Sequence, residues 1–216
     1  DTLDSLDKEA EAFMYNRKFY SNRSLKSKTV NTIIQMLFTK SEREKEHSDR
    51  VGLLSQAIAR HMQLSNEEVN RIRVAGFLHD IGKIGIDETI LNKKGKLDAS
   101  EWEIMKMHPV KSAGILDKTH EYQDISDIVI SHHERYDGKG YPGKFKGEDI
   151  PLEARIIAVA DTYDAITNDR PYRKPLEKNA AIEEMKRSAG TQLDPKIVSA
   201  LIEILTNENE PGDFPD

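Results

Sequence analysis

The chain has 216 residues, of which 37% are hydrophobic and 32% are charged, and its formal net charge is −6. This length fits one domain with a short extension, and the negative charge argues against a general electrostatic grip on a nucleic-acid polymer. The sequence contains no cysteine and no apolar run near the ~20 residues of a membrane span, which excludes disulfides, thiolate metal sites and a membrane-crossing segment in this chain.

Residues 1–40 are expected to form a helical extension. Within them, Val30, Ile33, Ile34 and Leu37 are spaced i, i+3, i+4, i+7, which predicts an amphipathic helix. This extension could join the domain to an upstream sensor or receiver domain, or form a homodimer contact. Because the chain starts without methionine and shows no signal peptide, we expect it to be cut from a longer cytoplasmic protein, which could itself be tethered to a membrane.

Residues 41–209 are predicted to form the main domain, and residues 210–216 a C-terminal tail. The main domain reads as all-α, because amphipathic helical segments recur along it. Ser65 and Glu68 have the spacing of a capping box and predict the start of a helix. We expect that helix to end near Gly82.

Three later segments complete the predicted organisation. Residues 137–151 are rich in glycine and proline, which predicts a loop. The run from 154 to 166 is apolar on all sides, as in a buried helix or a buried strand, and the helices on either side favour a helix. Asp194 and Pro195 have the residue types of an N-cap and a first helical position, so they predict the start of the last helix.

Histidine and aspartate occur beside apolar segments, which points to metal chemistry. His79 and Asp80 follow an apolar stretch, and a buried carboxylate is costly unless it is paired or bound to a metal. His132 and His133 follow another such stretch. Adjacent helical residues point about 100° apart, so this doublet suits one wide site better than one compact ion. Imidazole and carboxylate are the ligands that borderline metals accept.

Other histidines and aspartates have a plainer interpretation when taken alone. Asp161 lies inside the apolar run, where a carboxylate is either a buried hydrogen-bond acceptor or a ligand. His47 lies one position away from an apolar helix face. A lone histidine on a helix is more often a satisfied or exposed side chain, which is how we interpret His61 and His120.

Two motifs, in this order, carry a resemblance to a known family. The string HDIGK at 79–83 precedes HHERYDGKGYP at 132–142. The chain resembles, over about residues 41–205, the HD-GYP family of HD metal-dependent phosphohydrolases. The resemblance implies an all-α HD-domain helical bundle that hydrolyses cyclic dinucleotides, chiefly cyclic di-GMP, as the output module of a bacterial signalling protein. Supporting strings match at 47–51, 107–116, 159–173 and 190–195.

The resemblance also implies the role of each site residue. Asp80 would bridge two ions and Lys83 would approach the scissile phosphate. Tyr141 would lie against the bound nucleotide, and Arg170 and Arg173 would hold its phosphates. The metal-ligand positions of the family fall on His47, His79, Asp80, His108, His132, His133 and Asp161.

Family members bind two or three metal ions, often iron or manganese. A third ion goes with a glutamate four residues before the first histidine and a lysine three residues after the last aspartate. This sequence has Arg43 and Asp164 at those positions, so we favour two ions. A neighbouring carboxylate, from Glu42, Glu44 or Glu46, could compensate.

The implied reaction is attack on phosphorus by a hydroxide that bridges the two ions. It yields linear pGpG, and further cleavage to GMP is left open. Lys83 would either offset negative charge or protonate the leaving oxygen. Two alternatives remain: another cyclic dinucleotide such as 3′,3′-cGAMP as substrate, or a catalytically idle cyclic di-GMP receptor. We expect Glu134 to support a ligand histidine and Trp102 to lie in the core.

Overall fold

A computed structural model describes residues 27–168 and 174–207, and in these residues it contains helices and no β-strand, which confirms the predicted all-α fold. The α-helices are α2 (Lys28–Lys40), α3 (Glu42–His61), α4 (Asn66–Leu78), α5 (Glu88–Leu91), α6 (Ala99–Met105), α7 (His108–Leu116), α8 (Ser126–Ile130), α9 (Leu152–Thr167), α10 (Lys178–Ser188) and α11 (Pro195–Asn207). Three 3-10 helices connect them: η1 (Ile81–Gly85), η2 (Gln123–Ile125) and η3 (Gly147–Asp149).

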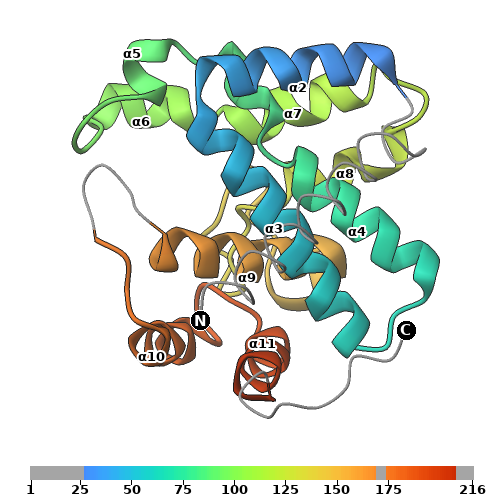
Figure 1. The fold of residues 1–216 in the computed structure, drawn as a ribbon, viewed down its shortest axis with the longest axis vertical. Helices are drawn as coiled ribbons and strands as arrows, with labels where there is room; N and C mark the ends of the chain where they lie inside the picture. Colours follow the sequence, from blue (N-terminus) through green and yellow to red (C-terminus); the bar gives the residue numbers. More distant parts are fainter. Residues whose placement is uncertain (1–26, 169–173, 208–216) are drawn as a thin grey trace, which may run out of the picture.

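The long helix α3 is the axis of the bundle and packs against both α4 and α9 (Figure 1). Its partner α4 begins at the predicted capping box, in which Ser65 and Glu68 bond each other's backbone N–H groups. The core side chains Ile58, Ile72 and Ile156 come from these three helices and are fully buried. Burial of each contributes about 2 kcal/mol.

The apolar run predicted as a helix forms α9, so the helical interpretation is confirmed. Ile157 and Ala160 are fully buried, which explains why the run shows no polar face. One side of the helix's C-terminal half faces α3, and this side carries Asp161 and Asp164. Two carboxylates therefore reach α3 from a helix that is otherwise part of the core.

Helix α2 packs on α3 and on η1, although the sequence assigned it to an extension. Val30, Ile34 and Leu37 are fully buried, as the amphipathic pattern predicts. The domain boundaries themselves stay a prediction, and residues 1–26 and 210–216 lie outside the described residues. None of the helices in the described ranges combines the length and the apolar composition that crossing a bilayer requires.

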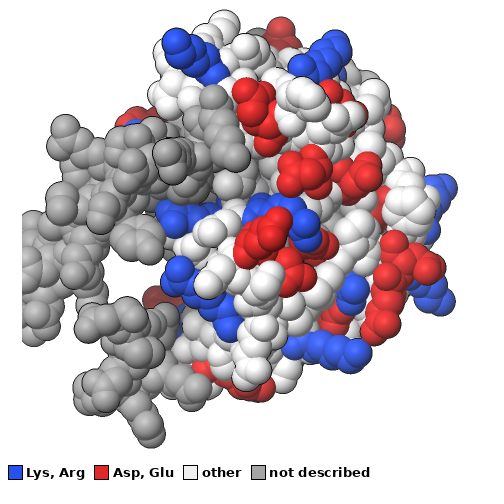
Figure 2. Space-filling view, turned by 90° about the vertical axis from the view of Figure 1, so that its right-hand side faces the viewer, with Lys and Arg blue, Asp and Glu red and all other residues white. Residues whose placement is uncertain are grey.

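The surface seen in Figure 2 carries acidic and basic side chains next to one another instead of a field of one sign. Such a surface offers no extended basic track for a nucleic-acid backbone.

The close approach of η1 to α7 requires a glycine at position 82. A Cβ atom built on Gly82 would lie 2.3 Å from the carbonyl oxygen of His108 and 2.4 Å from the amide nitrogen of Ser112. The Gly82 N–H also donates to the Ser112 hydroxyl over 2.8 Å. This contact fixes α7 beside η1, which follows α4.

We expect Gly82→Ala to lower the free energy of unfolding by about 2 kcal/mol or more, because the new methyl group meets backbone that cannot move freely. Gly114→Ala is the matched control, since a Cβ at that helical position meets nothing within 4 Å. The control should raise the free energy of unfolding by about 0.5–1 kcal/mol. Urea denaturation followed by circular dichroism measures both, and equal stability of the two variants would contradict the steric argument.

Candidate metal centre

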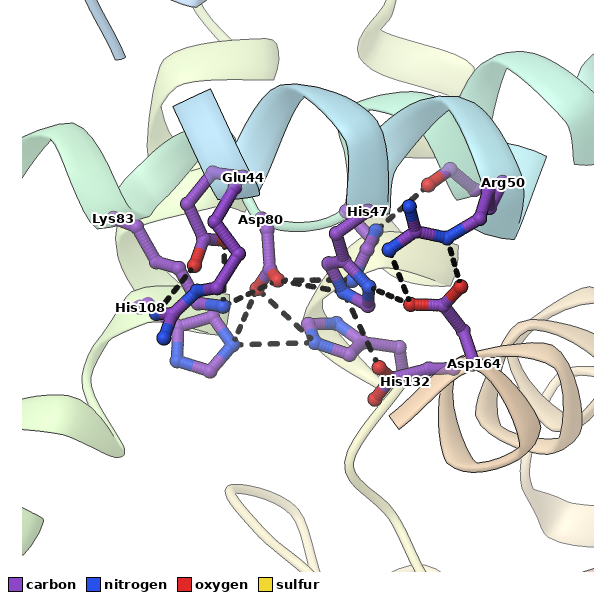
Figure 3. A network of polar contacts seen from close by, with 12 residues as sticks. Glu44, His47, Arg50, Asp80, Lys83, His108, His132 and Asp164 are labelled. Carbon is purple, nitrogen blue, oxygen red and sulfur yellow. Dashed lines mark hydrogen bonds and ion pairs between the residues drawn. The ribbon is translucent and has the colours of Figure 1, made fainter. Parts of the chain in front are cut away.

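The carboxylate of Asp80 lies at the centre of a cluster of imidazoles (Figure 3). Its Oδ2 atom is 3.0 Å from Nε2 of His79 and 3.5 Å from Nε2 of His47. Its Oδ1 atom is 3.0 Å from Nε2 of His108 and 4.0 Å from Nε2 of His132. Each oxygen of one carboxylate therefore faces a different pair of histidines.

The ligand atoms form two groups of three, and within each group they lie within 4.8 Å of one another. The first group is His47, His79 and Asp80, and the second is His108, His132 and His133. Asp161 joins them, because its Oδ1 atom is 3.3 Å from Nε2 of His47. The structure thus brings together all seven residues predicted as metal ligands, although they come from α3, α7, α9 and the turns that follow α4 and α8.

Three of the histidines are oriented by the chain immediately before them. The Nδ1 atoms of His79, His108 and His132 each lie at hydrogen-bond distance from the carbonyl oxygen three residues earlier, at 2.7, 2.8 and 2.5 Å. A proton on Nδ1 satisfies that carbonyl and leaves the Nε2 lone pair directed at the cluster. This tautomer is the one a metal ligand needs.

His47 is oriented differently, by a carboxylate distant in sequence. Its Nδ1 atom is 2.7 Å from Oδ2 of Asp164. Asp164 in turn accepts from Arg50 Nε at 2.5 Å and from Asn168 Nδ2 at 2.9 Å. A carboxylate behind a histidine fixes its ring and makes it a stronger ligand.

Sequence analysis placed Asp164 on the helical face of Asp161 and at the position of a family lysine, but it did not assign Asp164 this role. A signal was present in the spacing, because His47 and Arg50, and likewise Asp161 and Asp164, are three residues apart on one helical face.

The protonation states inside the cluster are shifted by burial and by the neighbours. Burial and the surrounding imidazoles hold the pKa of His132 well below its usual value and lower that of His133 to about 3. Burial would raise the pKa of Asp80, but the neighbouring His79, Lys83 and His108 outweigh it and hold the pKa well below the usual range. Neutral imidazoles and an ionised carboxylate are the states in which these groups bind metals.

His47 is the exception among these histidines. Burial opposes its charged form, but hydrogen bonds with Asp161, Asp164 and Asp80 raise its pKa well above the usual value. A cation entering the cluster would therefore displace a proton from this ring.

Two buried polar atoms in the cluster lack a hydrogen-bond partner among the described residues. They are Nε2 of His79 and Oδ1 of Asp80. A buried polar atom without a partner lowers the free energy of unfolding unless another group interacts with it. A divalent cation would do so, and the imidazole and carboxylate donors fit that class of ion.

Lys83 reaches the cluster from η1. Its Nζ atom is 2.6 Å from Oδ2 of Asp80 and 2.9 Å from Oε2 of Glu44. Both carboxylates outweigh the effect of burial and raise the pKa of Lys83. Glu44 is itself buried and is also paired with Arg43 over 3.1 Å, whereas Glu42 and Glu46 are exposed.

A cavity of about 740 Å³ opens from the cluster. Tyr141 lies on its wall, with its ring centroid 5.0 Å from that of His133. The loop that carries Tyr141 is held by Glu134, whose Oε1 atom accepts from the backbone N–H groups of Gly143 and Lys144. The expectation that Glu134 supports a ligand histidine is therefore wrong, since its bonds serve the loop.

The environment of Trp102 differs from the one expected from the sequence. Trp102 was expected in the core, but it is 45% exposed and lines the cavity. It lies on the short helix α6, none of whose residues is buried. Arg170 and Arg173 lie outside the described residues, so their predicted contacts with phosphate stay a prediction.

Comparison with known proteins adds a family and named relatives. Residues 31–197 match the family described as HD domain. A 3′3′-cGAMP-specific phosphodiesterase 2 from Vibrio cholerae is 34% identical over 212 residues, covering 93% of this chain and 41% of that protein. A cyclic di-GMP phosphodiesterase from Thermotoga maritima is 41% identical over 160 residues, covering 73% of this chain and 44% of that protein. The chain thus spans less than half the length of these relatives.

The fold agrees with a solved structure of an HDG"Y"P protein from Bdellovibrio bacteriovorus. The TM-score is 0.64 at 20% sequence identity, over 82% of this chain and 60% of that one. This likeness concerns the helical fold alone.

We expect Asp164→Asn to weaken metal binding about 10–100-fold, because the neutral amide no longer holds the His47 ring as a strong acceptor. Titration with Mn²⁺, followed by electron paramagnetic resonance of the free ion, measures the affinity without any assay of activity. The exposed Asp127→Asn is the control and should bind as the parent does. Unchanged affinity in a folded Asp164→Asn protein would show that His47 needs no such support.

Proposed function

Because the chain belongs to the HD domain family, and within it to the HD-GYP group that its motifs resemble, we propose that it is a metal-dependent phosphodiesterase that opens cyclic di-GMP to linear pGpG. One observation carries the proposal: Asp80 presents one oxygen to each of two histidine groups. A shared carboxylate of this kind suits two cations held close together, the arrangement used to hydrolyse phosphodiesters.

Members of this family use divalent metals, and the His and Asp groups of this chain could bind them. We propose two ions, iron or manganese. His47, His79 and Asp161 would hold one, His108, His132 and His133 the other, and Asp80 would contact both. When bound, such ions lower the pKa of water and neutralise charge on the phosphate oxygens.

The environment of Lys83 favours one of its two possible roles. Its ammonium group is fixed by ion pairs with Asp80 and Glu44, which keep a positive charge beside the cluster. Lys83 is therefore better suited to offset the negative charge that develops on the phosphate than to protonate the leaving oxygen. Asp80 and Glu44 hold its ammonium group beside the cluster, where the reacting phosphate would lie.

Two alternatives keep specific support. The relative aligned over 93% of this chain is named as specific for 3′3′-cGAMP, so that cyclic dinucleotide is the second candidate substrate. A catalytically idle receptor for cyclic di-GMP is the other candidate. It is less favoured, because all seven predicted ligands are present and converge.

The proposal extends to the protein around this domain. The relatives are more than twice as long as the aligned region. A sensor or receiver domain, a homodimer contact through residues 1–40, phosphate contacts from Arg170 and Arg173, and a cytoplasmic location belong to the proposal.

The direct test is hydrolysis of cyclic di-GMP and 3′,3′-cGAMP by protein reconstituted with iron or with manganese under reducing, oxygen-free conditions. We expect linear pGpG as product, and GMP as well if the second bond is also cleaved. Asp80→Ala should abolish product and lower metal content while the helical fold persists, because neither ion keeps its shared ligand.

The exposed Asp124→Ala is the control for Asp80→Ala and should retain parental activity. Native hydrolysis by Asp80→Ala would exclude the two-metal scheme. Full metal content without any product from either dinucleotide would favour the receptor.

We expect Lys83→Met to lower kcat about 10²–10³-fold with unchanged metal content, since removing one group that stabilises transition-state charge typically has this effect. Lys83→Arg should recover part of the rate because it restores the positive charge. Steady-state kinetics and metal analysis separate this loss from a loss of metal. A kcat within threefold of the parent in Lys83→Met would remove Lys83 from the reaction.

A further inference from the structure

Trp102 is a large apolar side chain that the packing of the fold does not explain. It is the sole tryptophan of the chain and is 45% exposed. Helix α6, which carries it, contributes no buried residue to the core. A single exposed apolar residue is ordinary, but this one lines the cavity that opens from the metal cluster.

Aromatic rings lead from the metal cluster to Trp102. The ring centroid of Tyr141 lies 5.0 Å from that of His133, and the two planes are tilted by 35°. The ring centroid of Trp102 lies 6.4 Å from that of Tyr141, and these planes are at 82°. The rings of Trp102 and Tyr141 are thus nearly perpendicular and both line the cavity, and we call them the aromatic corner. Leu97 and Met105 line the same cavity.

The position of Trp102 is fixed by polar contacts at the start of α6. Asp98 accepts from the backbone N–H groups of Ser100 and Glu101. Glu101 bonds the Asp98 N–H in return, which completes a capping box, and it pairs with Lys93 over 2.5 Å. The helix that carries the indole is therefore held by a capping box and by an ion pair. Little further ordering of this helix is needed when a ligand binds.

We propose that Trp102 stacks on a purine base of the substrate and, together with Tyr141, forms the base-binding corner of this cavity. The inference rests on the proposed function, because a cyclic dinucleotide has bases that extend away from its phosphates. When one phosphate lies at the cluster, a base can reach the aromatic corner. Each purine offers two flat faces, and the indole and phenol rings offer apolar surfaces to match.

Stacking of this kind supplies affinity with little discrimination between bases, because every base has a π-face. Trp102 should therefore serve cyclic di-GMP and 3′,3′-cGAMP alike. Base identity would have to be read by other groups around the cavity.

Kinetics of metal-reconstituted protein give the first test. We expect Trp102→Ala to raise KM for cyclic di-GMP about tenfold, with kcat within twofold, because the lost contact is made equally in the bound and transition states. Trp102→Phe should recover most of the loss. Ile104→Ala is the matched control, since this residue is on the same helix, is 43% exposed and does not line the cavity.

Fluorescence gives the second test and needs no turnover. Because Trp102 is the sole tryptophan, its emission reports only this site. We expect cyclic di-GMP to quench the emission of the parent protein, with a midpoint that matches the Kd from calorimetry on the same sample. The Ile104→Ala protein should be quenched to the same extent.

The outcomes separate this inference from the proposed function. Quenching without hydrolysis of either dinucleotide would support the stacking role of Trp102 and overturn the proposed phosphodiesterase activity. Hydrolysis with no quenching and an unchanged KM in Trp102→Ala would overturn the stacking site alone. A lower melting temperature of Trp102→Ala with an unchanged KM would give Trp102 a structural role and also overturn it. Absence of any binding by calorimetry would overturn both.

Discussion

The arrangement of the metal cluster depends on one buried charge, the carboxylate of Asp80. A buried carboxylate is costly unless other groups compensate it. Compensation here comes from imidazoles on three sides and from Lys83, which together hold the pKa of Asp80 well below its usual range. For these groups to meet, α4 must end at His79, η1 must turn, and α7 must approach closely enough that only glycine fits at position 82. The packing of this end of the bundle therefore brings together the groups that compensate the charge of one aspartate.

The rings of the histidines around Asp80 are oriented in two ways, and these differ in how far they depend on the packing of other helices. His79, His108 and His132 use a carbonyl oxygen three residues earlier, a contact that exists wherever the local chain turn forms. His47 instead uses Asp164 on another helix, so its orientation depends on how α3 and α9 pack. Small movements between these two helices would reach the cluster through His47 and through Asp161, which α9 carries. A change that leaves the other ligands in place could thus still alter metal binding.

Much of the fold and of the site could be predicted from the sequence, because the signals are local. The capping box at Ser65 and the apolar periodicity of α2 are confirmed, and the motifs give residues that converge. The spacing of Asp161 and Asp164 puts both carboxylates on one helical face, but it does not show that His47 lies opposite them. The pairing of Glu44 with Lys83 could not be predicted either, since it depends on how α3 packs against η1. Trp102 was wrongly expected in the core, because a preference for burial is an average, and α6 turns its only tryptophan towards a cavity.

The cavity has two ends of different chemistry, and this division bears on specificity. One end of the cavity contains the ionised carboxylates, the imidazoles and Lys83, which suit a phosphate group held by cations. All cyclic dinucleotides contain such phosphate groups. At the other end, Trp102 and Tyr141 offer flat apolar surfaces that accept any purine. The named relatives include phosphodiesterases for both cyclic di-GMP and 3′3′-cGAMP, as expected if a common framework binds the backbone and stacks the bases. Discrimination between them would then require few substitutions around the edge of the bases, away from the metal ligands.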